Sequence, residues 1–358
     1  ETRELESDYR PDASSQAADR TGAGGPIVAL AGGYDVKEWF VELGLPVRDN
    51  FNLEAGLRFA DYSTGNDTDA FKLGGYYQVN DQVSLRATVQ TATRHGSITE
   101  LYRGQGSSLT DLDPDPCGTD PETNIGPSYT QAQCANTGLP ASLYGSDLKS
   151  PADQYNILTG GNPNLVPEES ESTTIGIVLT PDAIPGLTLT LDYFDIVVED
   201  KIGTIPASTS LKNCLETGNP TFCNLIERDP IAGTLWVSPG QIITTNTNVA
   251  EESMTGFDLI FDYMLETGLG PIDIKGITTF TESNELTVMP GEAAIECAGY
   301  YGKSCGKNPM PEVAGNYTAS LSRGNLDYVL GMRYLVETED INTLSLIHIS
   351  EPTRLYGI

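Results

Sequence analysis

Apolar and polar residues alternate along most of the chain, with a period of two. Between residues 83 and 94, one face begins Val83, Leu85, Ala87, and the other begins Ser84, Arg86, Thr88. Alternation of this kind predicts strands with one apolar and one polar face. No segment of comparable length has a helical period, so we expect an all-β protein. Ten such segments start near Lys37, Phe51, Phe71, Val83, Thr174, Leu187, Phe257, Ile272, Val313 and Leu326.

Segment length and loop placement favour a membrane barrel over a soluble sandwich, although the strands of both folds would show alternating apolar and polar residues. The segments run about 9–13 residues, which suits a tilted membrane-crossing strand better than an ordinary one. Short turns alternate with longer connections, so an antiparallel meander places all the long loops on one side. Outer-membrane barrels sort their loops in this way. The short turns fall at 48–50, 80–81, 181–186, 269–270 and 324–325, and the long connections at about 95–170, 200–250 and 283–310.

Charge placement gives the faces of the expected barrel. The apolar faces carry no Lys or Arg, which would cost about 2–4 kcal/mol on a lipid-facing surface at mid-bilayer. We therefore expect Leu85, Leu189 and Phe261 to face outward, whereas a sandwich would bury them between two sheets. The opposite, lumen-facing register holds Arg58, Arg86, Lys275, Arg333, Glu38 and Glu42.

The overall composition excludes several partners. The 358 residues include 20 Lys and Arg against 50 Asp and Glu, a formal net charge of −30. Nucleic-acid binding needs a basic surface, so we expect no nucleic-acid partner. No stretch approaches the roughly 18 apolar residues of a membrane-spanning helix. The chain opens at Glu1 without a basic and apolar leader, which predicts a mature protein or a fragment.

Six cysteines form three neighbouring couples along the sequence. This arrangement predicts three short-range disulfides and an oxidising compartment. A zinc site is disfavoured, because no C-x-x-C motif is present and neither His95 nor His348 lies beside a cysteine. The expected pairs are Cys117–Cys134, Cys214–Cys223 and Cys297–Cys305.

Residues 36–46, which begin Val36-Lys37-Glu38, resemble a strand of TonB-dependent outer-membrane receptors. Residues 94–102 resemble a strand-to-loop motif of the same family, with His95-Gly96-Ser97 where the family usually has Ala-Pro-Asn. The best-preserved segment is Asn162-Pro163-Asn164-Leu165-Val166-Pro167-Glu168, which runs into the strand at 173–180. A Pro185-Gly186 turn and the strand segment 191–196 follow in the family's order.

The resemblance covers about residues 1–343 and implies about ten strands of a 22-stranded barrel. It implies import of a scarce nutrient (siderophore, cobalamin or saccharide class) through the outer membrane of a Gram-negative bacterium. The implied partners are lipid, lipopolysaccharide and, through a plug domain, the TonB complex. A plug and a TonB box are missing here, and we expect about eight strands before Glu1 and about four after the last. Residues 344–358 resemble translated sequencing adapter, and one more strand is the alternative.

Candidate chemistry is sparse, and we expect neither enzymatic activity nor a cofactor. Asp111, Asp113, Asp115 and Glu122 outline a calcium loop, but Pro116 occupies the place where that loop needs glycine. Loop aromatics could stack on a ligand or line the lipopolysaccharide-facing rim. These candidate ligand-binding residues are Tyr102, Tyr129, Tyr144, Tyr155, Trp236, Tyr300 and Tyr301.

The sequence therefore predicts part of an outer-membrane barrel, an open, curved antiparallel sheet with long extracellular loops. The resemblance implies that it binds and imports a nutrient. A secreted or surface β-sandwich adhesin is the main alternative. A passive porin is a third possibility, disfavoured by the motif series and the loop lengths.

Overall fold

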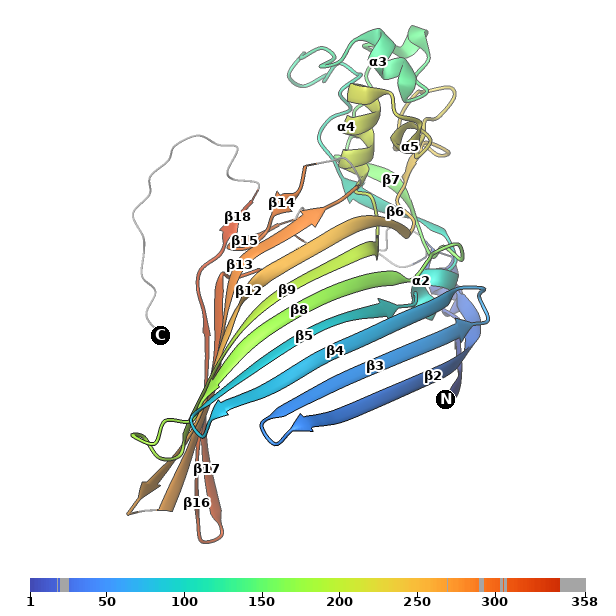
Figure 1. Cartoon of the computed structure of the whole chain (residues 1–358). Helices are drawn as coiled ribbons and strands as arrows, with labels where there is room; N and C mark the ends of the chain where they lie inside the picture. Colours follow the sequence, from blue (N-terminus) through green and yellow to red (C-terminus); the bar gives the residue numbers. More distant parts are fainter. Residues whose placement is uncertain are drawn as a thin grey trace.

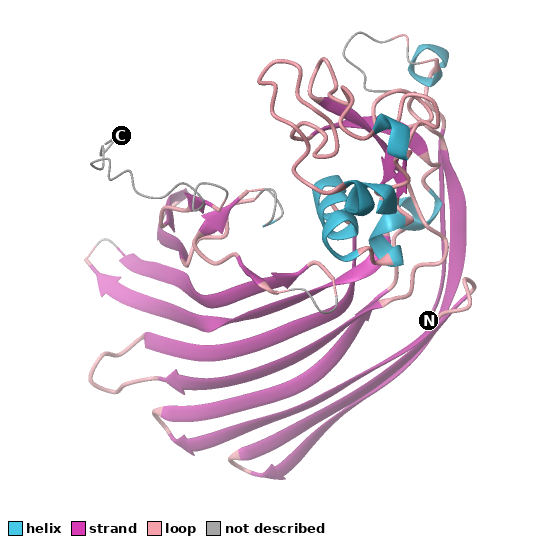
Figure 2. Ribbon diagram, turned by 90° about the horizontal axis from the view of Figure 1, so that it is seen from above, coloured by secondary structure: helices cyan, strands magenta, loops and turns pink. Residues whose placement is uncertain are grey.

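The computed structural model describes residues 1–17, 19, 26–268, 270–289, 293–302, 305 and 308–341. Its main feature is one long antiparallel sheet, curved like a section of a barrel wall (Figure 1, Figure 2). The strands follow one another across the sheet in chain order. They are β1 (Thr2–Tyr9), β2 (Leu30–Arg48), β3 (Phe51–Tyr62), β4 (Asp67–Asn80), β5 (Val83–Arg94), β8 (Glu168–Leu179), β9 (Leu187–Gly203), β12 (Thr247–Thr267), β13 (Gly270–Thr287), β16 (Val313–Arg323) and β17 (Leu326–Leu335).

All ten predicted strands are present, as β2 to β5, β8, β9, β12, β13, β16 and β17. The alternation does not predict strand β1, because its alternate residues are mostly charged and only Leu5 and Tyr9 mark an apolar face. Several strands are also longer than expected, since β12 has 21 residues and β2 has 19. These strands keep pairing with their neighbours beyond the length that crosses a bilayer.

The outward register is uncovered, which decides between the barrel and the sandwich. Leu85, Ile177, Leu191 and Leu259 lie side by side on successive strands. Leu85 is 43% exposed, and no second sheet packs against this face in the described part of the chain. The fold class predicted from the sequence is confirmed, and the adhesin sandwich is wrong.

Ion pairs identify the opposite, concave face as polar. Arg86 donates to Asp192 two strands away, and Arg58 donates to Glu38 on the neighbouring strand. By strand register, Arg333 shares the face of Arg86. The predicted lumen-facing set therefore lies on the concave side of the sheet.

A compact subdomain built from two long loops sits at one end of the sheet (Figure 1). We call residues 103–167 and 204–246 the loop subdomain. A four-stranded sheet runs through it, in the order β10 (Ile226–Glu227), β11 (Gln241–Ile243), β7 (Gln154–Thr159) and β6 (Gly106–Asp111). Its helices are α3 (Gln131–Asn136), the 3-10 turn η1 (Ala141–Leu143), α4 (Ala207–Thr217) and α5 (Pro220–Cys223).

The remaining elements are short. They are helix α1 (Ala13–Gln16), helix α2 (Ile98–Tyr102), strand β14 (Ile295–Glu296), which pairs with β13, and the parallel pair β15 (Tyr300–Tyr301) and β18 (Glu339–Asp340). None of the helices described is long or apolar enough to cross a membrane. Residues 344–358 lie outside the described residues.

The main hydrophobic core lies in the loop subdomain and not in the sheet. Leu148, Tyr155, Leu215, Leu235 and Ile242 are almost fully buried there. The curved sheet keeps its apolar residues on an outward surface that suits lipid contact, so it has little core of its own.

Candidate functional site

Helix α2 connects the end of β5 to the loop subdomain, and we call this helix the root of the loop subdomain. It begins with a capping box. Ser97 Oγ accepts a hydrogen bond from the Glu100 backbone N–H at 3.2 Å, and the Glu100 carboxylate accepts one from the Ser97 N–H at 2.7 Å. Together these bonds satisfy two otherwise free helix N–H groups. Ser97 therefore turns the chain here in place of the family's Ala-Pro-Asn segment.

An ion-pair clamp joins this root to the neighbouring strands. Arg94 at the end of β5 donates two hydrogen bonds to Glu168 at the start of β8, at 2.5 and 2.7 Å, and two more to Glu100. Glu168 also accepts from the backbone N–H of Ile202 at 2.7 Å. Burial raises the pKa of Glu100, but hydrogen bonds from Arg94 and Ser97 outweigh burial and hold that pKa below its usual value.

The Asn-Pro-Asn-Leu segment pins the second long loop to the same root. Asn162 Nδ2 donates to the Asn246 carbonyl at 3.0 Å, and Asn246 Nδ2 donates to the Glu100 carbonyl at 3.1 Å. Asn248 exchanges two hydrogen bonds with the Val166 backbone, both at 2.9 Å. The resemblance singled out residues 162–168, and the structure shows that they fasten both loops to the sheet.

His95 is buried beside the clamp. Its ring stacks on Tyr62 with centroids 4.2 Å apart and contacts Tyr34. Nδ1 lies 2.9 Å from the Gly96 carbonyl, which can only accept, so Nδ1 carries a proton. In the neutral ring Nε2 then accepts from the Thr64 hydroxyl, 2.8 Å away. Burial lowers the pKa of His95, although the hydrogen bond to Gly96 opposes this.

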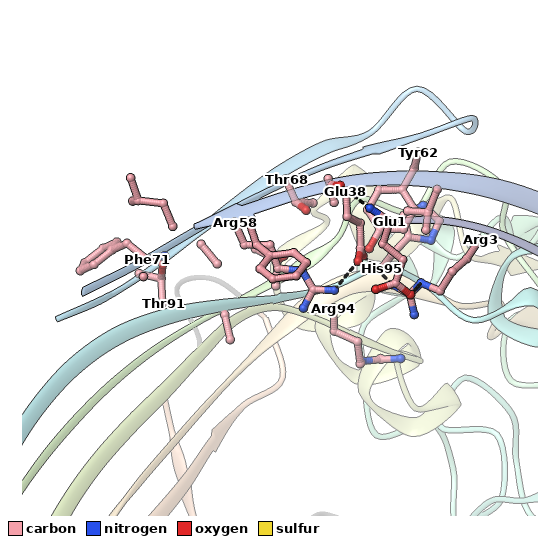
Figure 3. Close-up of a pocket in the computed structure, with 18 of the residues that line it drawn as sticks. Glu1, Arg3, Glu38, Arg58, Tyr62, Thr68, Phe71, Thr91, Arg94 and His95 are labelled. Atoms are coloured by element: carbon pink, nitrogen blue, oxygen red, sulfur yellow. Dashed lines mark hydrogen bonds and ion pairs between the residues drawn. The ribbon is translucent and has the colours of Figure 1, made fainter. Parts of the chain in front are cut away.

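Charged residues line a concave cavity of about 620 Å³ on β1 to β5 (Figure 3). Glu38 lies at its centre with its carboxylate between Arg3, at 2.5 Å, and Arg58, at 2.7 Å. Arg94 and His95 also line it. The mixed, paired charges make this wall a polar surface suited to a hydrated passage.

Three disulfides and a buried ion pair hold the loops. Cys117–Cys134 and Cys214–Cys223 lie within the loop subdomain, and Cys297–Cys305 lies in the next long loop. These are the pairs expected from the sequence. Arg228 donates to both oxygens of Asp115, at 2.6 and 3.2 Å, and to Thr137 and the Gly233 carbonyl. The side chains of Arg228 and Asp115 are 1% and 0% exposed.

A second cavity, of about 520 Å³, lies where the loop subdomain meets the ends of β9, β12 and β13. We call it the loop-base cavity. Leu112 and Ile157 line it from the loop subdomain, and Val249 and Leu286 line it from the sheet. Its wall is mainly apolar, with hydroxyl side chains, Lys201 and Asp111 among the polar groups.

The seven candidate aromatic residues do not form one site, and none lines the two cavities described above. Tyr155 is 1% exposed within the main core, which corrects its assignment to ligand stacking. Tyr129 and Tyr144 pack against that core, and Tyr144 donates to the Tyr129 carbonyl at 2.8 Å. Trp236 also packs against that core, and its indole N–H donates to the Leu148 carbonyl.

The other three candidates lie elsewhere. Tyr102 belongs to α2 and packs against a small core of Leu101, Leu165 and Ile202. Tyr300 and Tyr301 form β15, and Tyr301 is exposed. Their role as ligand contacts stays a prediction.

Two of the four residues that outline a calcium loop are held by basic side chains. Asp115 is engaged by Arg228, and Glu122 accepts from Lys149 at 2.9 Å. No group of three or more His, Cys, Asp or Glu side chains in the described part of the chain could hold a metal ion.

Comparisons with known proteins agree with this architecture. A family model described as the TonB dependent receptor-like beta-barrel matches residues 1–345. No curated protein matches the sequence. A mutant ferric enterobactin receptor from Pseudomonas aeruginosa, solved with enterobactin, is 13% identical at a TM-score of 0.50; the match covers 92% of this chain and 44% of that one.

Two further solved structures are similar at lower TM-scores. The siderophore receptor PirA from Acinetobacter baumannii is 17% identical with a TM-score of 0.48, and the match covers 86% of this chain and 35% of that one. The Serratia marcescens hemophore receptor HasR, in complex with its hemophore and heme, is 16% identical with a TM-score of 0.47, covering 88% and 45%. This chain thus spans less than half the length of each solved relative. The family match over nearly the whole sequence shows that this chain belongs to the TonB-dependent receptor β-barrel family.

Proposed function

We propose that this chain forms part of the wall and the outer loops of an outer-membrane receptor that binds a scarce small-molecule nutrient and imports it into the periplasm. Members of the family are transporters and not enzymes. The proposed nutrient belongs to the siderophore, cobalamin or saccharide class. Energy would come from the TonB complex through a plug domain, and the outward face would contact lipid and lipopolysaccharide of a Gram-negative outer membrane.

One observation carries the proposal: a braced loop subdomain stands over a polar concave wall whose other face is apolar. The clamp at Arg94 and the asparagines at 162 and 246 fix both long loops to the wall. Loops fixed in this way present a stable surface at the mouth of the passage. Such preorganisation lowers the entropy lost when a ligand binds.

Uptake in cells tests the proposal. A strain that lacks the receptor carrying this chain would be grown on a panel of limiting nutrients, with iron supplied as different siderophores and cobalamin or saccharides supplied singly. We expect loss of growth on one nutrient, restored by the receptor only when the TonB complex is present. Restoration without that complex would indicate a passive porin and contradict the proposal.

A further inference from the structure

The loop-base cavity combines an apolar wall with one uncompensated negative charge. Leu112, Ile205, Val288 and Ile295 supply apolar surface from three separate parts of the chain. Its volume of about 520 Å³ lies within the usual range for small-molecule sites, roughly 300–1,000 Å³. A protein segment is a poorer match for so compact a space.

The charges at the cavity do not balance. Lys201 is its basic lining residue, and Glu252 on β12 neutralises it in an ion pair. Asp111, at the end of β6, is exposed, and its carboxylate forms no hydrogen bond or ion pair with another described side chain. The electrostatic potential around Asp111 is also negative, because the loop subdomain holds ten acidic residues against four basic ones. This potential repels anions and attracts cations.

Hydroxyl groups supply hydrogen-bonding capacity at the same place. Thr204, Ser208 and Thr209 line the cavity beside the start of α4. None of their hydroxyls bonds to another described side chain. A few polar groups around an apolar wall are the usual composition of a site that orients a small ligand.

From this chemistry we propose that the loop-base cavity binds a small molecule with an apolar body and a positively charged group, with the charge placed toward Asp111. The inference rests on the proposed receptor function and narrows its ligand class. Asp111 and the acidic loops disfavour an anionic ligand of the same size.

The test uses three probes that share one fluorophore: dansylcadaverine, a cation; dansylamide, which is neutral; and dansylglycine, an anion. Each is titrated against the receptor carrying this chain in lipid nanodiscs, with empty nanodiscs subtracted. We expect saturable binding that is tightest for the cation and weakest for the anion. Equal binding of all three, tightest binding of the anion, or no saturable binding overturns the proposal.

Two pairs of variants locate the binding. Asp111→Asn should reduce the preference for the cation over the neutral probe about threefold, as for charges about 6 Å apart in water. Asp113→Asn, a matched change of an exposed residue that does not line the cavity, should leave the preference unchanged. An equal effect of both changes would overturn the role of Asp111.

The second pair tests the apolar wall. Gly203 lines the cavity, and a Cβ built on it meets no atom within 4 Å, so Gly203→Phe places a bulky side chain at the cavity wall from an open position. It should weaken all three probes at least tenfold. Gly44→Phe, at an equally open position of β2, should have no effect. Unchanged binding in Gly203→Phe overturns the assignment.

The probe titrations need no energy source, whereas import does, so the two experiments test the two proposals separately. Probe binding without any growth phenotype would remove the import function and leave the cavity's ligand class intact. A growth phenotype with no charge preference among the probes would do the reverse.

Discussion

Removing Arg228 should unfold the loop subdomain locally, because it leaves the buried Asp115 carboxylate without its charged partner. Asp115 is 0% exposed and its main charged partner is the Arg228 guanidinium, 2.6 Å away. Two unit charges about 4 Å apart attract by ~4 kcal/mol at an effective dielectric of 20. Loss of one partner of a buried pair typically costs about 3–5 kcal/mol. Arg228→Met also removes the hydrogen bonds to Thr137 and Gly233.

Hydrogen exchange of the intact receptor would measure this cost. A loss of ~4 kcal/mol corresponds to about 10³-fold faster exchange of protected amides in α4 and β7, provided that they exchange through opening of this unit. The double variant Asp115→Leu/Arg228→Met replaces both charges by apolar groups and should recover most of the protection. The reasoning is refuted if the single change accelerates exchange less than fivefold, or if the double variant is as unstable as the sum of both single changes.

Three further predictions concern the root and the loops. Arg94→Gln should cost about 1.5–3 kcal/mol of stability around α2, since it removes charge-assisted hydrogen bonds to two carboxylates. The control Lys72→Gln, in an exposed ion pair, should change stability by under about 0.5 kcal/mol. Protease cleavage near residue 103 measures both changes, and equal effects would argue against the clamp. The pKa of His95 is lowered in the fold and is about 6.5 in the unfolded chain, so its contribution to stability is complete above about pH 6.5 and falls as the pH drops toward the folded pKa. His95→Gln should abolish this loss of stability in thermal melts between pH 7.5 and 5. An unchanged pH slope would contradict the assignment of the loss to His95. Replacing Cys214 and Cys223 by serine should cost ~2.5 kcal/mol, because the disulfide joins cysteines 9 positions apart. Non-reducing peptide mapping that joins either cysteine to another loop would contradict the pairing.

The sequence predicted the wall better than the loops, for physical reasons. A strand with one face toward lipid and one toward water must alternate, so Leu85 and Arg86 reveal their faces without a structure. Strand β1 lacks that contrast and was missed. Helix α4 was missed although Ala207, Leu211 and Leu215 recur at helical spacing and Gly218 ends it with φ +66°. That pattern was obscured because it lies inside a loop.

The long-range contacts of the site left no local signal. Asp115 and Arg228 are 113 residues apart, and Asn162 contacts a residue 84 positions away. Disulfide pairs were predictable because each joins cysteines close in sequence. The sequence pattern offers the loop aromatics as ligand or rim contacts, but a loop subdomain of this size needs its own core, and Tyr155 belongs to that core.

The central claim is that the apolar register of the sheet faces lipid and the polar register faces water. Nitroxide labels placed singly at Leu85 and Leu191, and at Thr88 and Gln90 on the opposite register, would measure it in the receptor reconstituted in bilayers. We predict that the first two labels collide mainly with oxygen, which concentrates in lipid, and the other two mainly with a water-soluble nickel chelate. If labels at 85 and 191 were accessible to neither reagent, or to the chelate more than to oxygen, the outward face would not contact lipid and the account of a membrane receptor wall would be contradicted.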